Sequence, residues 1–502
     1  MDILFLTAET SVLMEEWGTF THFSVALSKS LRCLGHSVTV CLPYSPVLDT
    51  NGLLMVRRLT TLVLEIEGQS VELTVLDGKL ASQVDIIAIG GIERFPEGAQ
   101  KEIRRQGSPL SLEVTRSFLL FARASLELIK QRTVSGFSFD IVHCDGWQTA
   151  PFPLFLNQFY QTQRNFICPK TVLTVHHEVD HQWFSCTALD ALFPDLFHSD
   201  QRQKIWWVEE GITNVDAVTS NSEAHRERIE QKLEESFAAY KAERGTTATI
   251  RCGIDYSLWN PAIDPALVVR YDAEDPTHKA NCKIALQEEY GFECEVDAPL
   301  LLTILYRISN EEKSLFLSTL RKAVDKVDFS LIISTFPSSS FLSEEIDELV
   351  SLSRGKIICV PTVDSTLLHR LIAGADIALI PAYPKRLRDM PLWFQRYGAL
   401  PVAYASHGMH EMIIDCDEKF ENGTGFLFYE KRVSHFLKAI ERALAAKQSP
   451  RWPTLVRQAM KLDLSWDRPA RQYEQLYRLL LRRTSDGLEN DRSRRGGLNQ
   501  SR

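Results

Sequence analysis

The sequence contains no CxxC pair and no regular spacing of histidines and cysteines, although it has ten cysteines. Zinc sites and disulfide frameworks depend on such spacings, so we expect neither a metal site nor disulfides, and the thiols should stay reduced. The sequence also lacks a basic stripe, and its formal net charge is -9. Because nucleic-acid binding depends on neutralising phosphates with lysine and arginine, this charge argues against a nucleic-acid-binding function.

Long apolar runs are absent as well. The apolar run within residues 1–7 is too short to cross a membrane, and it lacks the basic flank of a signal peptide. We therefore expect a cytoplasmic protein without a membrane partner. Residues 483–502 contain almost no apolar side chain, so burial cannot offset the entropy lost on ordering. We expect this segment to be a disordered tail.

The sequence does contain an alternation of short apolar runs with longer amphipathic ones. Residues 3–6 and 38–42 have the pattern of buried strands, and residues 20–33 between them have the pattern of an amphipathic helix. Further buried strands are predicted in two series. The first series comprises residues 140–144, 171–176 and 217–221, and the second comprises residues 300–305, 331–334, 356–360, 377–381 and 401–404.

Repeated strand–helix–strand units predict parallel sheets with helices on both faces, and two series predict two Rossmann-like domains. The length of 502 residues and the 44% hydrophobic content allow two large cores. The turn-rich segment 259–265 marks the boundary. We therefore expect an α/β fold with a first domain over residues 1–258 and a second over residues 259–482, whose last helices cross back to the first.

Residues 253–265, GIDYSLWNPAIDP, resemble the segment GIDYDVWNPATDP of bacterial ADP-glucose-dependent glycogen synthases and starch synthases. Further similarity lies in residues 140–149, 216–222, 373–376, 423–426 and 464–468. This resemblance implies a GT-B glycosyltransferase, with two Rossmann-like, doubly wound domains facing a central cleft. It places the acceptor side in the first domain and the nucleotide-sugar side in the second. It also implies an α-glucan and a nucleotide sugar as partners, and no cofactor.

In this family, cations hold the diphosphate of the glucosyl donor while glucose is transferred with retention of configuration. This chain carries glutamates at several of these positions. Glu16 stands at the lysine of the family's KTGGL loop, in which Gly18 is kept, and Glu209 stands at the lysine of LKxGI. A unit charge ~4 Å from a phosphate is worth about 4 kcal/mol at an effective dielectric constant near 20. Exchanging attraction for repulsion at two such positions therefore predicts loss of ordinary nucleotide-sugar binding.

The family's RLTxQKG segment is only partly preserved. Arg307 is kept, whereas Glu312 has the spacing of the lysine and Lys313 follows one residue later. The family's HDW becomes Asp145-Gly146-Trp147. Each of these changes falls where the resemblance places the substrates.

A loop over residues 381–398, PAYPKRLRDMPLWFQRYG, has the same length as the family's PSRFEPCGLNQLYALRYG. It follows a predicted strand, at the junction where open α/β sheets bind ligands. The resemblance places Lys385 at the position of a glutamate and keeps Tyr397 and Gly398. In the family's TGGL turn, only Gly408 of the two glycines remains.

The resemblance therefore nominates His176, at the histidine of a family HN motif, Arg307 and Lys385 as catalytic residues. Each has a structural alternative: His176 as a satisfied strand-end histidine, Arg307 as a counter-charge for nearby glutamates, and Lys385 as part of a solvated loop. His177 and His181 lie near His176, but they do not make a credible metal site. The candidate substrate-binding residues are Glu16, Gly18, Trp147, Glu209, Lys313, Tyr397, Gly398 and Gly408.

The departures predict a glycogen synthase-like protein of α-1,4-glucan biosynthesis that is catalytically impaired or inactive. Such a protein would act by binding a glucan, a protein of glycogen metabolism or an active synthase. The alternative is an active retaining glucosyltransferase that moves glucose from ADP-glucose, or another nucleotide sugar, to a growing α-1,4-glucan. A third possibility, a general sugar-phosphate-binding module, explains the fold but not the similarity of residues 253–265.

Overall fold

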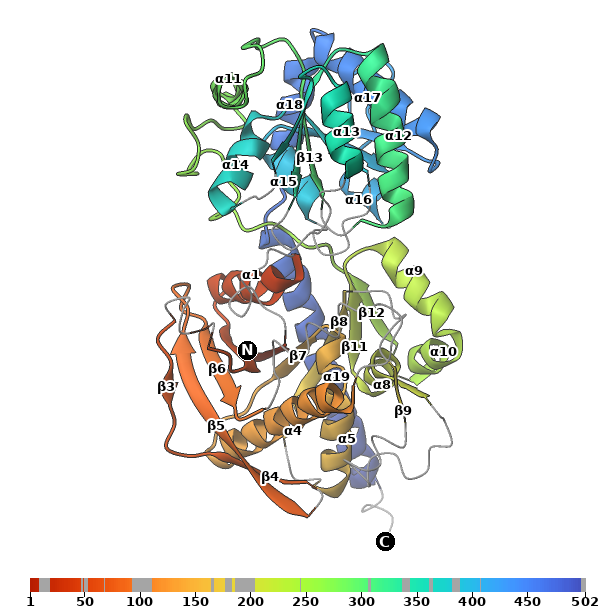
Figure 1. Cartoon of the computed structure of the whole chain (residues 1–502). Helices are drawn as coiled ribbons and strands as arrows, with labels where there is room; N and C mark the ends of the chain where they lie inside the picture. Colours follow the sequence, from red (N-terminus) through yellow and green to blue (C-terminus); the bar gives the residue numbers. More distant parts are fainter. Residues whose placement is uncertain are drawn as a thin grey trace. The chain divides into compact units, whose positions relative to one another are not determined.

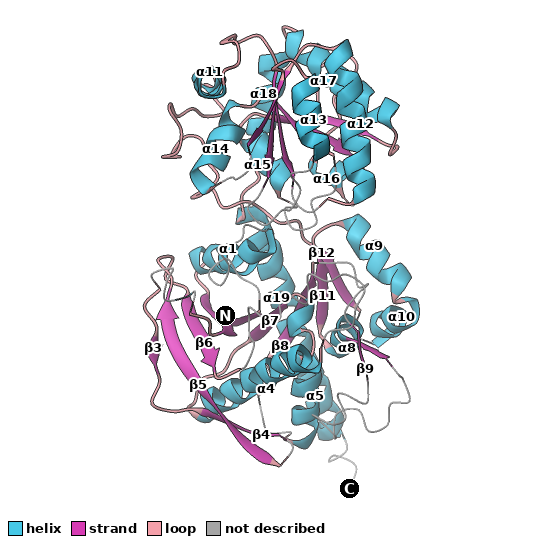
Figure 2. Ribbon diagram, viewed as in Figure 1, coloured by secondary structure: helices cyan, strands magenta, loops and turns pink. Residues whose placement is uncertain are grey.

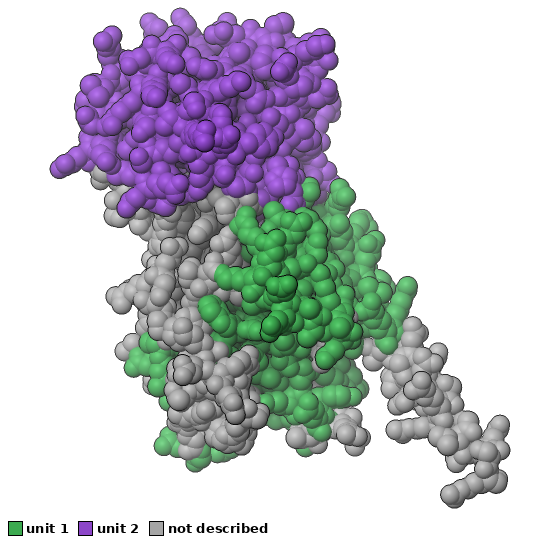
Figure 3. All heavy atoms as spheres, turned by 90° about the vertical axis from the view of Figure 1, so that its right-hand side faces the viewer, with its two compact units in different colours: residues 1–252, 466–502 green, residues 253–465 purple. Residues whose placement is uncertain are grey.

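The computed structural model describes most of the chain, and for residues 19–22, 162, 183–185, 204 and 484–497 it describes the backbone only. The chain forms two compact units (Figures 1 and 3). Unit 1 comprises Met1–Cys252 and Trp466–Arg502, and unit 2 comprises Gly253–Ser465. The described residues are 1–8, 19–46, 48, 53–66, 68–92, 111–163, 167–176, 183–185, 204–243, 245–305, 308–335, 344–360, 364–381, 389–406 and 408–497.

Unit 1 is built on a ten-stranded sheet with the order β12-β11-β8-β7-β1-β2-β6-β5-β3, in which β4 also pairs with β5. The strands from β12 to β6 are parallel, whereas β3, β4 and β5 form an antiparallel extension. The strands are β1 (Asp2–Thr7), β2 (Ser37–Pro43), β3 (Val56–Arg57), β4 (Leu62–Ile66), β5 (Gln69–Lys79), β6 (Asp85–Gly90), β7 (Ile141–Asp145), β8 (Lys170–Val175), β11 (Ala217–Ser220) and β12 (Thr246–Thr249).

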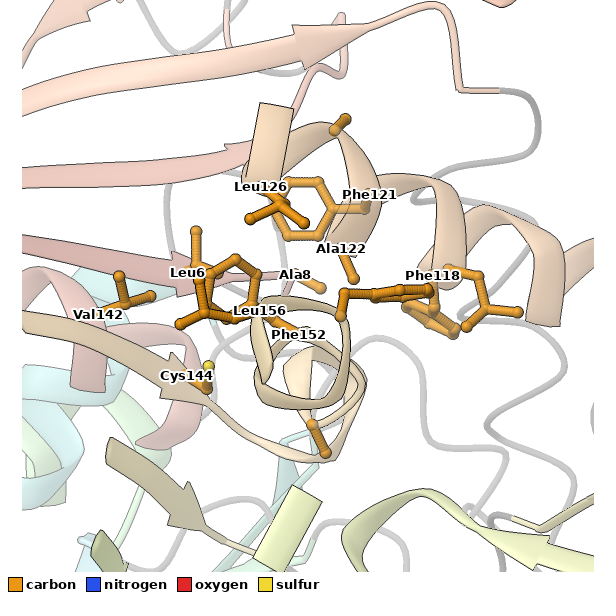
Figure 4. Packing of buried hydrophobic residues seen from close by; sticks show 14 of the residues in the cluster. Leu6, Ala8, Phe118, Phe121, Ala122, Leu126, Val142, Cys144, Phe152 and Leu156 are labelled. Carbon is orange, nitrogen blue, oxygen red and sulfur yellow. The ribbon is translucent and has the colours of Figure 1, made fainter. Parts of the chain in front are cut away.

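Two hydrophobic cores lie on opposite faces of this sheet. Successive residues of β1 alternate between them: Leu4 and Leu6 belong to one core, and Ile3 and Phe5 to the other. The first core contains residues of α4 (Leu112–Val134), α5 (Phe152–Thr162) and α8 (Trp207–Asn214), and Figure 4 shows part of its packing. The second core contains residues of α1 (Thr19–Cys33) and α19 (Asp467–Gly497). Unit 1 also contains η1 (Trp147–Thr149), α9 (Glu223–Lys232), α10 (Glu234–Glu243) and the paired short strands β9 (Trp183–Ser185) and β10 (Lys204–Trp206).

The last helix, α19, packs onto the sheet of the first unit. Tyr473 and Tyr477 are fully buried there among the rings of Phe23 and His143. The backbone of α19 continues as helix to Gly497, where the sequence predicted a disordered tail from residue 483. The lack of apolar side chains argues against burial of this segment, but it does not prevent a helical backbone, because the hydrogen bonds of an α-helix form within the segment itself.

Unit 2 is built on a six-stranded sheet with the order β15-β14-β13-β16-β17-β18, and every pair in it is parallel. Helices accompany these strands (Figure 2). The parallel strands of unit 1 and the parallel sheet of unit 2, together with their helices, confirm the predicted α/β fold class. The strands are β13 (Leu300–Leu305), β14 (Ser330–Thr335), β15 (Ile357–Val360), β16 (Ile377–Ile380), β17 (Leu400–Tyr404) and β18 (Phe426–Phe428). The helices are α11 (Lys279–Tyr290), α12 (Asn310–Lys326), α13 (Glu344–Leu352), α14 (Ser365–Gly374), α15 (Met390–Arg396), α16 (Met409–Met412), α17 (Val433–Gln448) and α18 (Trp452–Met460).

None of the helices in the described part of the chain combines the length and the apolar character that a bilayer crossing requires.

Candidate functional site

A row of polar side chains lies at the carboxyl ends of four adjacent parallel strands of unit 1, β1, β7, β8 and β11. Thr7 and Asp145 end β1 and β7, and His176 and Asn221 directly follow β8 and β11. The hydroxyl of Thr7 donates a hydrogen bond to Asp145 Oδ2 at 3.0 Å. Carboxyl ends of strands are where open α/β sheets bind ligands. We refer to these four residues as the polar row.

His176 stands at the centre of the polar row, and both of its ring nitrogens are hydrogen-bonded. Its Nε2 lies 2.5 Å from Asp145 Oδ1, and its Nδ1 lies 2.9 Å from the amide nitrogen of Asn221. The rings of Phe23 and His176 pack in a T-shaped arrangement, with ring centroids 4.7 Å apart. His176 is buried, with 3% of its surface exposed. The sequence nominated this histidine, but it identified neither of its two side-chain partners.

A second histidine, His143, lies in the interior of the sheet below the polar row. Its ring nitrogens are 2.7 Å from the hydroxyl of Tyr477 and 2.6 Å from that of Thr174. Burial holds the pKa of His143 well below its ordinary value. His143 is therefore neutral and connects β7 and β8 to helix α19.

Trp147, a predicted substrate-binding residue, lies in η1 just after Gly146, whose φ is 80°. Its side chain is buried and packs against Phe118, with ring centroids 5.1 Å apart. It belongs to the core that contains α4. In the structure, Trp147 therefore packs in the hydrophobic core, which is the most common role of large aromatic residues.

Glu209 lies in the first turn of α8. Its carboxylate accepts a hydrogen bond from the hydroxyl of Ser236 on α10. The glutamate that stands at the family's lysine position is therefore bound by a neighbouring helix of unit 1.

Glu312 has a similar local partner at the start of α12 in unit 2. The hydroxyl of Ser309 accepts a hydrogen bond from the backbone N–H of Glu312, and the carboxylate of Glu312 accepts one from the backbone N–H of Ser309 at 2.9 Å. This is a capping box, which satisfies backbone donors at both residues. The next residue, Lys313, is predicted to bind substrate. Its Nζ lies 2.5 Å from the carboxylate of Glu345 on α13, and its side chain is 18% exposed.

Tyr397 is completely buried in unit 2. Its hydroxyl donates to Asp264 at 2.5 Å, and His369 Nδ1 lies 2.6 Å from the same carboxylate. Burial alone would raise the pKa of Asp264, but the hydrogen bonds from His369 and Tyr397 hold it below its ordinary value. Burial also raises the pKa of Tyr397. Gly398 follows with a φ of 73°, and a Cβ there would lie 2.9 Å from Val456 Cγ1.

The segment with the strongest resemblance, residues 253–265, contributes to the core of unit 2. The indole of Trp259 stacks between Trp393 and His369, with centroid distances of 4.2 and 4.3 Å. Asp264 from the same segment binds His369 on α14. This run is therefore explained by packing within unit 2.

Of the remaining predicted site residues, only Gly408 lies within the described part of the chain. Gly408 precedes α16 with a φ of 88°, a left-handed conformation that favours glycine. Glu16, Gly18, Arg307 and Lys385 lie outside the described residues. Over the described ranges, no three histidine, cysteine, aspartate or glutamate side chains are arranged to hold a metal ion.

Asp145 and Asn221 were not predicted as partners of His176 in the polar row. A signal was present, since each stands at or directly after the end of a predicted buried strand. Parallel strands bring their carboxyl ends to one edge of the sheet, so these positions converge with His176.

Comparisons with known proteins agree with this architecture. A family model described as starch synthase catalytic domain matches residues 2–239. The glycogen synthase of Chlorobium phaeobacteroides is 30% identical over 380 residues, which cover 73% of this chain and 75% of that protein. The glycogen synthase of Thioalkalivibrio sulfidiphilus is 29% identical over 503 residues, which cover 96% of this chain and 100% of that protein.

Among solved structures, the catalytic domain of starch synthase IV from Arabidopsis thaliana, bound to ADP and acarbose, is similar in fold. The TM-score is 0.78 at 21% identity, with 96% of this chain and 99% of that chain covered. The likeness confirms the GT-B fold that the two parallel sheets indicate. Together with the identity to the Chlorobium protein over three quarters of its length, it leads to one conclusion. The chain belongs to the glycogen and starch synthase family.

Proposed function

We propose that this member of the family has lost efficient glucosyl transfer and acts by binding an α-glucan or a protein of glycogen metabolism in the cytoplasm. The observation that carries the proposal is the capping box of α12, in which Glu312 folds back onto its own helix start. In this proposal the first domain keeps the acceptor side and the second domain keeps only the frame of a nucleotide-sugar side.

The start of a helix normally attracts anions, because its free N–H groups and the helix dipole both favour negative charge. In α12, the first turn carries Glu311 and Glu312, and the Glu312 carboxylate occupies backbone and hydroxyl donors of Ser309. A phosphate approaching this helix start would meet two carboxylates and a donor that is already used. This arrangement supports weak binding of a diphosphate.

Glu209 and Lys313 give independent support. Glu209, at a lysine position of the family, is held by Ser236. Lys313, the one lysine near the family's RLTxQKG lysine, is paired with Glu345. Binding of a phosphate by Lys313 would require breaking this ion pair, so its positive charge is already partly neutralised.

The proposal is tested by two assays on the full chain. Transfer of labelled glucose from ADP-glucose and UDP-glucose to glycogen should be absent or very slow, and the protein should sediment with glycogen. Measurable transfer that disappears in Arg307→Ala would instead support the alternative, an active retaining glucosyltransferase. If the protein neither transfers glucose nor sediments with glycogen, glucan binding is excluded, and binding of a protein of glycogen metabolism is the role that is left.

A further inference from the structure

The hydrogen bonds of the polar row have a definite direction. Thr7 donates to one oxygen of Asp145, and His176 Nε2 lies 2.5 Å from the other. An ionised carboxylate can only accept, so the proton between these groups belongs to His176 Nε2. On the other side of the ring, the amide nitrogen of Asn221 can only donate, so Nδ1 of His176 is the acceptor of that hydrogen bond. These contacts select one of the two neutral tautomers.

We infer that Asp145 and Asn221 are positioning residues that hold His176 as the Nε2–H tautomer and keep both of its ring nitrogens engaged within the protein. Asp145, His176 and Asn221 lie at the ends of three adjacent strands, β7, β8 and β11, so the sheet itself fixes the separation of the three side chains. Phe23 packs against the ring and opposes its rotation. Asp145, His176 and Asn221 are each more than nine-tenths buried.

The substitution at Asp145 changes which protons His176 can give to or take from a ligand. It stands where the resemblance places the histidine of HDW, so a group that can donate a hydrogen bond is replaced by one that accepts it from His176. In this state His176 can neither take up a proton at Nδ1 nor donate from Nε2 to a ligand without breaking an internal contact. This consequence rests on the proposed function, whereas the tautomer of His176 does not depend on it.

The tautomer is measured directly by two-bond proton–nitrogen NMR correlations of the full chain labelled with 15N-histidine. His176→Gln identifies the signals of His176. At neutral pH the wild type should show a single tautomer with the proton on Nε2, and that proton should be strongly deshielded by the short contact with Asp145. A doubly protonated ring, a proton on Nδ1 or an average of the two tautomers would overturn the inference.

Variants of Asn221 separate positioning from mere packing. In Asn221→Ala, Nδ1 loses its donor, so its signal should move to the range of an imidazole nitrogen without a hydrogen bond, while Asp145 keeps the proton on Nε2. In Asn221→Asp, the new carboxylate can only accept, so both ring nitrogens should move to the range of a protonated imidazole. Asn157→Ala is the matched control, because it removes an asparagine that donates to Asn214 elsewhere in unit 1 and should leave the His176 signals unchanged.

An unchanged His176 pattern in both Asn221 variants would contradict a positioning role for Asn221. If either variant fails to fold, the wild-type spectrum and the remaining variant still decide the tautomer. A wild type with the Nε2–H tautomer that transfers glucose rapidly would support the inference and refute the proposed function. The two claims can thus fail separately.

Discussion

Glu312 accepts hydrogen bonds from both the backbone nitrogen and the hydroxyl of Ser309, at 2.9 and 2.8 Å. The glutamate that the sequence marked as a lost lysine therefore has a structural task at the beginning of α12. Its carboxylate stabilises the helix start and at the same time makes that start a poor site for a phosphate.

Replacing Ser309 by alanine should lower the free energy of unfolding by about 1 kcal/mol, because the helix loses its N-cap acceptor. Urea unfolding curves of the two proteins measure the difference. The control is Ser351→Ala, since Ser351 is exposed on unit 2 and its hydroxyl donates to the carbonyl of Asp347 in its own helix rather than capping a helix start. Equal losses in the two variants would contradict a capping role for Ser309.

Trp259→Ala should destabilise unit 2 by about 3–5 kcal/mol, as is typical for deleting a large buried aromatic side chain. The indole is buried between Trp393 and His369, so its removal leaves a cavity and two unstacked rings. Thermal or urea unfolding gives the measurement. Tyr429→Ala, at a side chain that is 65% exposed, should change stability by no more than about 0.5 kcal/mol. A loss below about 1 kcal/mol in Trp259→Ala would show that the stack is not a main support of unit 2.

Acid should destabilise the protein through His143. Its folded pKa lies well below the ordinary value of 6.5, so below pH 6.5 the unfolded chain binds a proton that the folded protein does not. The free energy of unfolding therefore falls as the pH falls below 6.5, by up to about 1.4 kcal/mol per pH unit.

The contribution of His143 is isolated by substitution. His143→Gln cannot take up the proton, so its unfolding free energy should fall less steeply with decreasing pH in that range. His435→Gln, at a half-exposed histidine that lies near Glu430, serves as the control and should keep the wild-type slope. An unchanged slope in His143→Gln would mean that His143 is not the group that causes the acid sensitivity.

Restoring positive charge should restore affinity for the donor nucleotide. Glu209→Lys combined with Glu312→Lys should strengthen ADP binding by at least about tenfold, which corresponds to about 1.4 kcal/mol. Glu227→Lys combined with Glu418→Lys makes the same change in net charge at exposed positions of the two units, and it should have little effect. No gain in the first pair would indicate that ADP binding is prevented sterically rather than by charge.

Most parallel strands of the two units could be predicted because they are nearly continuous apolar runs buried on both faces, as in β13 and β16. The parallel strands β12, whose sequence TTAT is not an apolar run, and β18, which has only three residues, were not predicted. The antiparallel extension was not predicted. In β4 the residues alternate between buried and exposed, but the exposed Val63 is apolar and conceals this alternation in the sequence. The strand β6, in contrast, is an apolar run of the same kind as the others and was overlooked.

At the site, the sequence predicted His176 but not the two side chains that are hydrogen-bonded to it. Its partners Asp145 and Asn221 are 31 and 45 residues away along the chain, so only the order of the strands reveals the contacts. The role of Glu312 could have been predicted, because Ser309-Asn-Glu-Glu312 has the S-x-x-E pattern of a capping box. A glutamate at the position of the family's lysine both removes a positive charge and completes the capping box.

Calorimetric titration of the wild-type chain with ADP-glucose measures directly whether donor binding has been lost. We predict no saturable binding at concentrations up to ~1 mM, the upper end of typical Michaelis constants. Micromolar binding of ADP-glucose by the wild-type protein would contradict it.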